Sequence, residues 1–147
     1  MSIQIHKDLK VVIPQHKVGR IVAISDIHGC LDELCRLLDK VKLKPFDTVI
    51  FLGDYVDRGG HSDGVVRRIK ALGEECFVYA IRGNHDDKII RYHKHVLKQK
   101  DNPDYKIPMR RNETYNSLMP ESIEYLLDTP HAVFIERGEE TPWAFCH

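Results

Sequence analysis

The chain has 147 residues, of which 42% are hydrophobic and 30% are charged, and these values are typical of one soluble globular domain. Because 22 Lys and Arg balance 22 Asp and Glu, we expect no general affinity for nucleic acid polymers or anionic membranes. We also expect neither a membrane span nor a secretory signal. The cysteines at 30, 35, 76 and 146 fit neither a zinc motif nor a disulfide framework, which favours reduced thiols in a cytoplasmic protein.

Short β-branched runs alternate with segments of helical periodicity in the first part of the chain. Strands are expected over 11–13, 21–24, 48–52 and 76–81, and helices over 31–41, from the residue after Ser62 to Leu72, and over 86–98. In the second of these helices, Ser62 is the expected N-cap and Gly73 the expected end. This order predicts an α/β fold with a largely parallel sheet and helices outside it.

The later part of the chain has a different pattern. The expected elements are a loop over 100–111, short helices over 113–118 and 121–127, and a β-hairpin with strands over 131–136 and 142–146. We expect one domain rather than two. Because the chain ends on an apolar run without a polar tail, we interpret its end as a cut inside a strand–loop unit.

A polar cluster follows each of the strands predicted at 21–24, 48–52 and 76–81. The clusters are Asp26-Ile27-His28-Gly29, Gly53-Asp54-Tyr55-Val56-Asp57-Arg58-Gly59 and Gly83-Asn84-His85-Asp86. In parallel α/β sheets, ligands bind beyond the carboxyl ends of the strands, so we expect these clusters to meet at one edge. A turn or a salt-bridged loop explains each cluster alone, but all three in this order favour a single site.

The side chains of these clusters are suited to divalent metals. Carboxylate, imidazole and amide donors accept Mn, Fe, Zn or Mg. Asp26 and His28 are two residues apart and can reach one ion from an extended segment, Asp54 can bridge two ions, and Asn84 offers a neutral oxygen. Two adjacent ions are suited to an in-line displacement at phosphorus.

Other residues of the clusters are suited to phosphoryl chemistry. Arg58 can bind phosphoryl oxygens through its planar guanidinium. His85 is a candidate proton donor, with Asp57 as the carboxylate that orients it. His147 closes an apolar strand as the clusters do, so it is a further candidate ligand. The other six histidines are interpreted as exposed or structural, with His93 and His95 on a solvated helix face; the remaining four are His6, His16, His61 and His131.

These motifs resemble the phosphoprotein-phosphatase branch of the calcineurin-like metallophosphoesterases. The pattern of that family is Gly-Asp-x-His-Gly, Gly-Asp-x-Val-Asp-Arg-Gly, Gly-Asn-His-Glu and then an apolar strand that ends in His. Here Ser25 replaces the first Gly and Asp86 replaces the Glu, and neither change removes a metal ligand. Phe145-Cys146-His147 is similar to the start of the fourth motif.

The resemblance implies an α/β sandwich of two mixed sheets flanked by helices, with the second sheet incomplete. Residues 1–147 would form the N-terminal part of one metallophosphoesterase domain, about two-thirds of it. The final Gly-His motif and a later phosphate-binding Arg of the family are missing. A chain that ended here would be weakly stable and nearly inactive, because the edge of its second sheet would be exposed.

The resemblance also assigns ligands for two divalent metal ions, with Mn favoured over Fe, Zn or Mg. Asp26 and His28 would hold the first metal, and Asp54 would bridge. Asn84 and His147 would hold the second metal.

The same resemblance assigns the remaining roles and a reaction. His85 and Asp57 would form the proton-donating pair, while Arg58 and Asn84 would bind the substrate phosphate. A metal-activated hydroxide would hydrolyse a phosphate ester or a phosphoanhydride in line, without a phosphoenzyme.

The sequence does not decide between two classes of substrate. Gly83-Asn84-His85-Asp86-Asp87-Lys88 is similar to diadenosine-tetraphosphatase-like members, whereas Val56-Asp57-Arg58-Gly59 is shared with Ser/Thr protein phosphatases. The substrate would therefore be a dinucleoside polyphosphate or a phosphorylated protein. The alternative is a non-catalytic metal-binding scaffold of the same fold, and the oligomeric state stays open.

Overall fold

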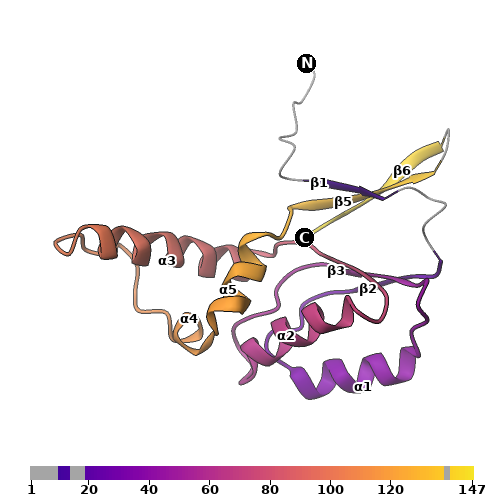
Figure 1. The fold of residues 1–147 in the computed structure, drawn as a ribbon, viewed down its shortest axis with the longest axis horizontal. Coiled ribbons are helices and arrows are strands. Elements are labelled where there is room, and N and C mark those ends of the chain that lie inside the picture. Colours follow the sequence, from indigo (N-terminus) through magenta and orange to yellow (C-terminus); the bar gives the residue numbers. More distant parts are fainter. Residues whose placement is uncertain (1–9, 14–18, 138–139) are drawn as a thin grey trace.

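Two three-stranded sheets pack face to face, and helices cover the outer face of one of them (Figure 1). The computed structural model describes residues 10–13, 19–137 and 140–147, so His6, His16 and the tip of the predicted hairpin at 138–139 lie outside the described residues. The elements are β1 (Lys10–Ile13), β2 (Ile21–Ile24), α1 (Leu31–Val41), β3 (Thr48–Phe51), α2 (Ser62–Leu72), β4 (Phe77–Ala80), α3 (Asn84–Asp101), α4 (Glu113–Ser117), α5 (Pro120–Leu127), β5 (Ala132–Arg137) and β6 (Glu140–Cys146).

The first sheet has the order β2-β3-β4, and all of its pairings are parallel, as predicted. Every residue of the central strand β3 is buried. Val49 and Phe51 belong to the core beneath α1 and α2, while Ile50 belongs to the core between the sheets, as the alternation of side chains along a strand requires. The strand is apolar on both faces because both faces are covered.

The second sheet has the order β1-β5-β6. β5 pairs antiparallel with β6, which confirms the predicted hairpin, and parallel with β1. Val133 and Ile135 of β5 pack with Ile50 and Ile81 from the region of the first sheet. This packing brings the end of β6, and with it His147, to the carboxyl edge of the first sheet.

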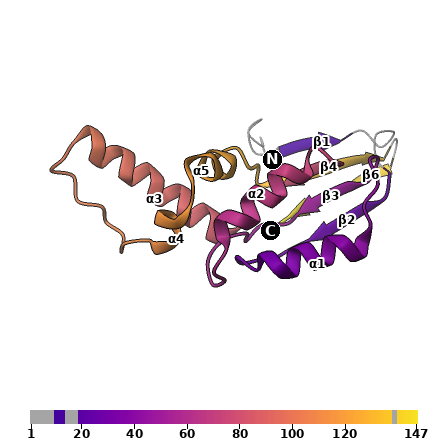
Figure 2. The same ribbon diagram turned by 60° about the horizontal axis from the view of Figure 1, so that its bottom comes forward.

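Helix α3 begins at that edge and extends away from both sheets (Figure 2). It starts at Asn84, two residues before the predicted start at residue 86, so it includes three residues of the third cluster. The early start is stabilised by Asp86, whose Oδ2 accepts the Gly83 N–H at 2.9 Å. None of the helices in the described part of the chain combines the length and the apolar character of a membrane span.

Two local expectations are wrong. Ser62 is not the N-cap of α2 but its first residue, and its hydroxyl accepts the Asp57 N–H at 3.2 Å. His93 and His95 are half-buried rather than solvated. Their Nδ1 atoms lie 2.9 and 2.6 Å from the hydroxyls of Tyr115 and Tyr105 respectively, because the loop after α3 and helix α4 fold back along α3 (Figure 1). All four cysteines are free thiols.

Candidate active site

The loops that follow β2, β3 and β4 meet at one edge of the first sheet, as predicted. We call this edge the rim; its residues are Asp26, His28, Asp54, Asp57, Arg58, Asn84, His85 and, from the end of β6, His147. The parallel pairing continues beyond the strands, since His28 N–H donates to Asp54 O at 2.9 Å and Asp26 N–H to Gly53 O at 3.3 Å. The first two clusters are therefore held in register by main-chain hydrogen bonds.

Five rim residues have a left-handed backbone. The φ angles are 50° at Asp26, 47° at His28, 58° at Asp54, 67° at Asp57 and 66° at Arg58. This region is uncommon outside glycine, and a residue held there costs on the order of 1–3 kcal/mol. Such strain persists only where surrounding contacts enforce it, and its concentration at the rim indicates a functional site.

Two glycines allow the second and third clusters to approach closely. A Cβ on Gly83 would lie 2.2 Å from Asp54 Oδ1 and 2.3 Å from Asp54 N. Gly53 has a φ of 97°, and a Cβ there would lie 2.6 Å from Gly83 Cα and 2.9 Å from His147 Nδ1. Both positions therefore require glycine if Asp54 and His147 are to share the rim.

The Asp86 side chain fixes the second cluster against the third and was not predicted to do so. It is fully buried, and its carboxylate accepts N–H bonds from Asp54 at 2.8 Å, Gly83 at 2.9 Å and Tyr55 at 3.0 Å. Burial and the nearby Asp54 charge raise the pKa of Asp86, against the effect of these three donors. The sequence marks Asp86 only as a departure from the motif of the family.

The Nε2 atoms of two histidines lie near one carboxylate. His28 Nδ1 donates to Val56 O at 2.9 Å and His147 Nδ1 donates to Leu52 O at 2.8 Å, so in each neutral ring Nε2 carries the lone pair. These Nε2 atoms lie 3.6 Å from Asp54 Oδ2 and 3.5 Å from Asp54 Oδ1 respectively. Imidazole nitrogens and carboxylate oxygens are ligands that divalent metal ions accept, so the donor set fits such ions.

Possible ligand atoms form two groups that share Asp54. One group contains Asp26, Asp54 and His147, the other contains His28, Asp54 and His85, and the atoms of each group lie within 4.8 Å of one another. Asn84 Oδ1 lies 3.0 Å from His147 Nε2. The grouping places Asp26 beside His147, whereas the resemblance pairs it with His28. Asp54 has the central position expected of a bridging carboxylate.

His85 and Asp57 form a hydrogen-bonded pair at the rim. His85 Nδ1 lies 2.8 Å from Asp57 Oδ2, and the Thr114 hydroxyl donates to Asp57 Oδ1 at 2.5 Å. Burial raises the pKa of Asp57, but the hydrogen bonds from Thr114 and His85 outweigh it and hold that pKa below its usual value. Asp57 is therefore an anion that orients the imidazole, and the His85 ring lies close to that of His28 in an edge-to-face arrangement, with ring centres 4.8 Å apart.

Sequence reasoning missed Thr114. It lies 57 residues from Asp57, on the short helix α4 and outside every motif. Its only sequence signal is its place as the second residue of α4, two residues after the N-cap Asn112, which says nothing about the rim.

Arg58 is exposed, and among the described residues it has no hydrogen-bond or ion-pair partner. An unpaired guanidinium next to Asp57 can bind an anion without first breaking an ion pair. Asn84 is also exposed, at the first residue of α3. Both side chains are therefore accessible at the rim.

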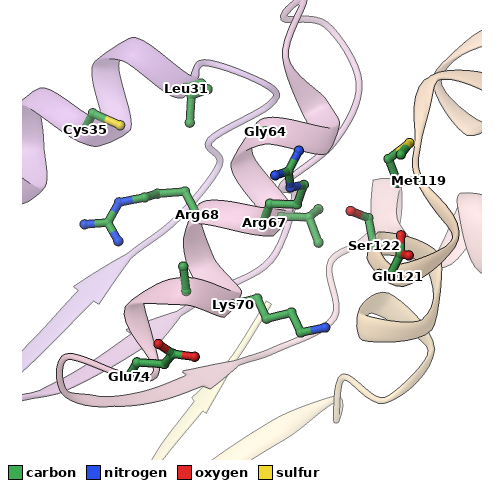
Figure 3. Close-up of a pocket in the computed structure, with 12 residues that line it drawn as sticks. Leu31, Cys35, Gly64, Arg67, Arg68, Lys70, Glu74, Met119, Glu121 and Ser122 are labelled. Atoms are coloured by element: carbon green, nitrogen blue, oxygen red, sulfur yellow. The ribbon is translucent and has the colours of Figure 1, made fainter.

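A groove of about 870 Å³ lies apart from the rim, bordered by α1, α2 and α5 (Figure 3). The residues that line it include Arg67 and Lys70 but also Glu74 and Glu121, and none of them belongs to the rim. Because basic and acidic side chains are mixed there, the groove has no clear preference for a phosphate. We therefore assign the chemistry to the rim.

Curated proteins with related sequences are named as tetraphosphatases. The asymmetrical bis(5'-nucleosyl)-tetraphosphatase PrpE of Halalkalibacterium halodurans is 38% identical over 78 residues, which are 47% of this chain and 32% of that protein. The symmetrical bis(5'-nucleosyl)-tetraphosphatase of Escherichia coli is 48% identical over 64 residues, which are 43% of this chain and 22% of that protein. The chain thus spans about a third or less of the length of these curated relatives.

Solved structures share the fold. A crystal structure provisionally described as a diadenosine tetraphosphatase has 30% identity and a TM-score of 0.66, over 92% of this chain and 60% of that chain. A metallophosphoesterase from Sphaerobacter thermophilus has 24% identity and a TM-score of 0.55, over 78% of this chain and 43% of that chain. The family described as calcineurin-like phosphoesterase matches residues 19–141, and the chain belongs to this family.

Proposed function

We propose that the protein hydrolyses a dinucleoside tetraphosphate with the help of two divalent metal ions. The observation that carries this proposal is the Asp54 carboxylate, which faces the Nε2 atoms of both His28 and His147. The pair of His85 and Asp57 stands beside it. The two curated relatives described above are named as tetraphosphatases, which favours a phosphoanhydride over a phosphoprotein as substrate.

The proposed metal ligands come from all three clusters and from β6. They are Asp26, His28, Asp54, Asn84 and His147. We infer Mn²⁺ as the metal, because mixed oxygen and imidazole ligands suit it. Bound divalent ions supply Lewis-acid stabilisation of phosphoryl oxygens and lower the pKa of water.

In the proposed reaction, the residues of the rim donate a proton, orient the donor and bind the phosphoryl oxygens. The oxygen of a water molecule bonds to phosphorus while the bond from phosphorus to the bridging oxygen breaks, and the electron pair stays on the bridging oxygen. His85 donates a proton to that oxygen and is protonated again from solvent, which receives a proton of the attacking water. Asp57 accepts the Nδ1–H of His85, orients the ring and stabilises the imidazolium that donates from Nε2. Arg58 and Asn84 bind the phosphoryl oxygens and orient them.

A side-by-side turnover assay tests the proposal. The whole protein that carries this chain is incubated with Mn²⁺ and either diadenosine tetraphosphate or a phosphoserine peptide, and the products are separated by chromatography. We expect hydrolysis of diadenosine tetraphosphate, with two ADP if the central anhydride is cut and AMP plus ATP if an outer one is cut. Turnover of the peptide alone would overturn the proposal in favour of a protein phosphatase, and no turnover of either would favour a scaffold.

Thr114→Val is expected to slow the hydrolysis of substrates whose leaving group depends on the proton from His85. Valine keeps the shape of threonine but removes the hydroxyl that donates to Asp57 Oδ1, and loss of such a supporting hydrogen bond typically costs about 10–100-fold in activity. We expect about tenfold loss of kcat on phenyl phosphate, which has a poor leaving group, and a smaller loss on p-nitrophenyl phosphate.

Thr114→Ser is the matched control for this prediction, because serine retains the hydroxyl. It should restore most of the activity of the wild-type protein on phenyl phosphate. Equal losses on both substrates in Thr114→Val would show that Thr114 supports the fold and not the proton donor.

A further inference from the structure

Lys88 lies beside the proton-donating pair without belonging to it. It follows His85 by three residues on α3, so both side chains are on one face of the helix. Its Nζ is 3.8 Å from Asp57 Oδ2, and this is the same oxygen that His85 Nδ1 approaches. The Lys88 side chain is 51% exposed, so its ammonium stands between the rim and solvent.

The ammonium of Lys88 makes only one long contact with the described part of the protein. Arg91 and Arg82, the neighbouring cations, are both near Asp87, at 3.0 and 4.0 Å. Lys88 has only the distant contact with Asp57 among the described residues. Both oxygens of that carboxylate have closer partners, as described above, so the three donors of the ammonium stay available.

The segment that begins at Lys88 is strongly basic. Residues 88–111 contain eight Lys and Arg but only two Asp and no Glu, although the whole chain is neutral. This segment comprises most of α3 and the loop that folds back along it (Figure 2). An anion that extends from the rim past His85 therefore enters a region of positive potential.

The two classes of substrate differ in what their leaving group needs. The leaving group of a phosphoserine ester is an alkoxide, whose main requirement is a proton. The leaving group of a dinucleoside tetraphosphate is a nucleoside phosphate that already carries several negative charges. A nearby cation therefore stabilises it as the bond to phosphorus breaks. A lysine immediately beyond the proton donor is suited to the second kind of leaving group.

We propose that Lys88 binds the leaving polyphosphate half of the substrate next to His85 and thereby favours phosphoanhydrides over phosphomonoesters. This inference rests on the proposed function. Lys88 is a specificity residue in this account, since it contacts the part of the substrate that departs and not the phosphorus that is attacked.

Lys88→Gln in the whole protein tests the proposal. We expect kcat/KM for diadenosine tetraphosphate to fall by at least about tenfold, as for the loss of one charge-assisted contact, and kcat/KM for p-nitrophenyl phosphate to fall by less than about threefold. Inhibition by inorganic tripolyphosphate provides a second readout, and its Ki should rise by at least about tenfold. Lys88→Arg should retain most of the preference for the anhydride.

Lys94→Gln is the matched control, because Lys94 is an exposed lysine of the same helix without a contact at the rim. In this variant, kcat/KM for both substrates and the Ki for tripolyphosphate should stay within about twofold of the wild-type values. Equal losses on both substrates in Lys88→Gln would mean that Lys88 acts only through Asp57, and an unchanged Ki would also overturn the proposal. If wild type does not hydrolyse diadenosine tetraphosphate at all, the proposed function fails, and this outcome is distinct from a Lys88→Gln variant that behaves like wild type.

Discussion

Asp54→Asn is expected to lower Mn²⁺-dependent turnover of diadenosine tetraphosphate by at least about 100-fold. The substitution removes the charge that His28 and His147 face from two sides, and with it the electrostatic reason for two cations to share the rim. Asp54 Oδ1 accepts a hydrogen bond from the main-chain N–H of His85 at 3.0 Å. Asparagine retains one side-chain oxygen, which can still accept this bond. The Tm of the metal-free variant should therefore not fall.

Asp39→Asn is the matched control for this prediction. Asp39 is exposed on α1, and the same change of charge there should leave both turnover and Tm unaffected. Turnover of Asp54→Asn within about twofold of wild type would refute the assignment of Asp54, because groups with this role contribute far more than that.

Gly83→Ala is expected to have a comparable effect through the backbone. A Cβ at this position would lie 2.2 and 2.3 Å from atoms of Asp54, one of which is its main-chain nitrogen, so the loop after β3 must move. Overpacking of this kind costs about 1–3 kcal/mol in the free energy of unfolding. Because a displacement of about 1 Å can cost about 100-fold in rate, we expect turnover to fall by that amount or more.

Gly60→Ala separates the clash from a general effect of replacing glycine. Gly60 lies in the loop after β3, and a Cβ there would meet no atom within 4 Å. Its stability and turnover should stay near those of wild type. Denaturant unfolding and turnover of both variants provide the comparison, and a fully active Gly83→Ala would show that the close approach of Gly83 to Asp54 is not required.

The sequence predicts the first sheet and the three clusters because their signals are local. Each strand is a short apolar run, and each cluster follows its strand directly, so the parallel arrangement alone brings Asp26, Asp54 and Asn84 to one edge. His147 could be predicted in the same way from its place at the end of an apolar strand. These residues required no knowledge of distant contacts.

The supporting contacts could not be predicted because they join distant segments. Thr114 reaches Asp57 across 57 residues and a charged loop, and a threonine at the start of a short helix has no distinctive pattern. The partners of His93 and His95 depend on how the loop after α3 folds back, which periodicity does not describe. The role of Asp86 depends on three main-chain donors whose positions the sequence does not contain.

The central claim is that Asp54 joins two metal ions at the rim. A titration of the metal-free whole protein with Mn²⁺, followed by electron paramagnetic resonance, tests it most directly, because two Mn²⁺ ions that share a carboxylate at about 3.5–4 Å have coupled electron spins. The account predicts two bound ions per chain with a coupled spectrum, and loss of that coupling in Asp54→Asn. A wild-type protein that binds no Mn²⁺, or binds only isolated ions with uncoupled spectra, would contradict it.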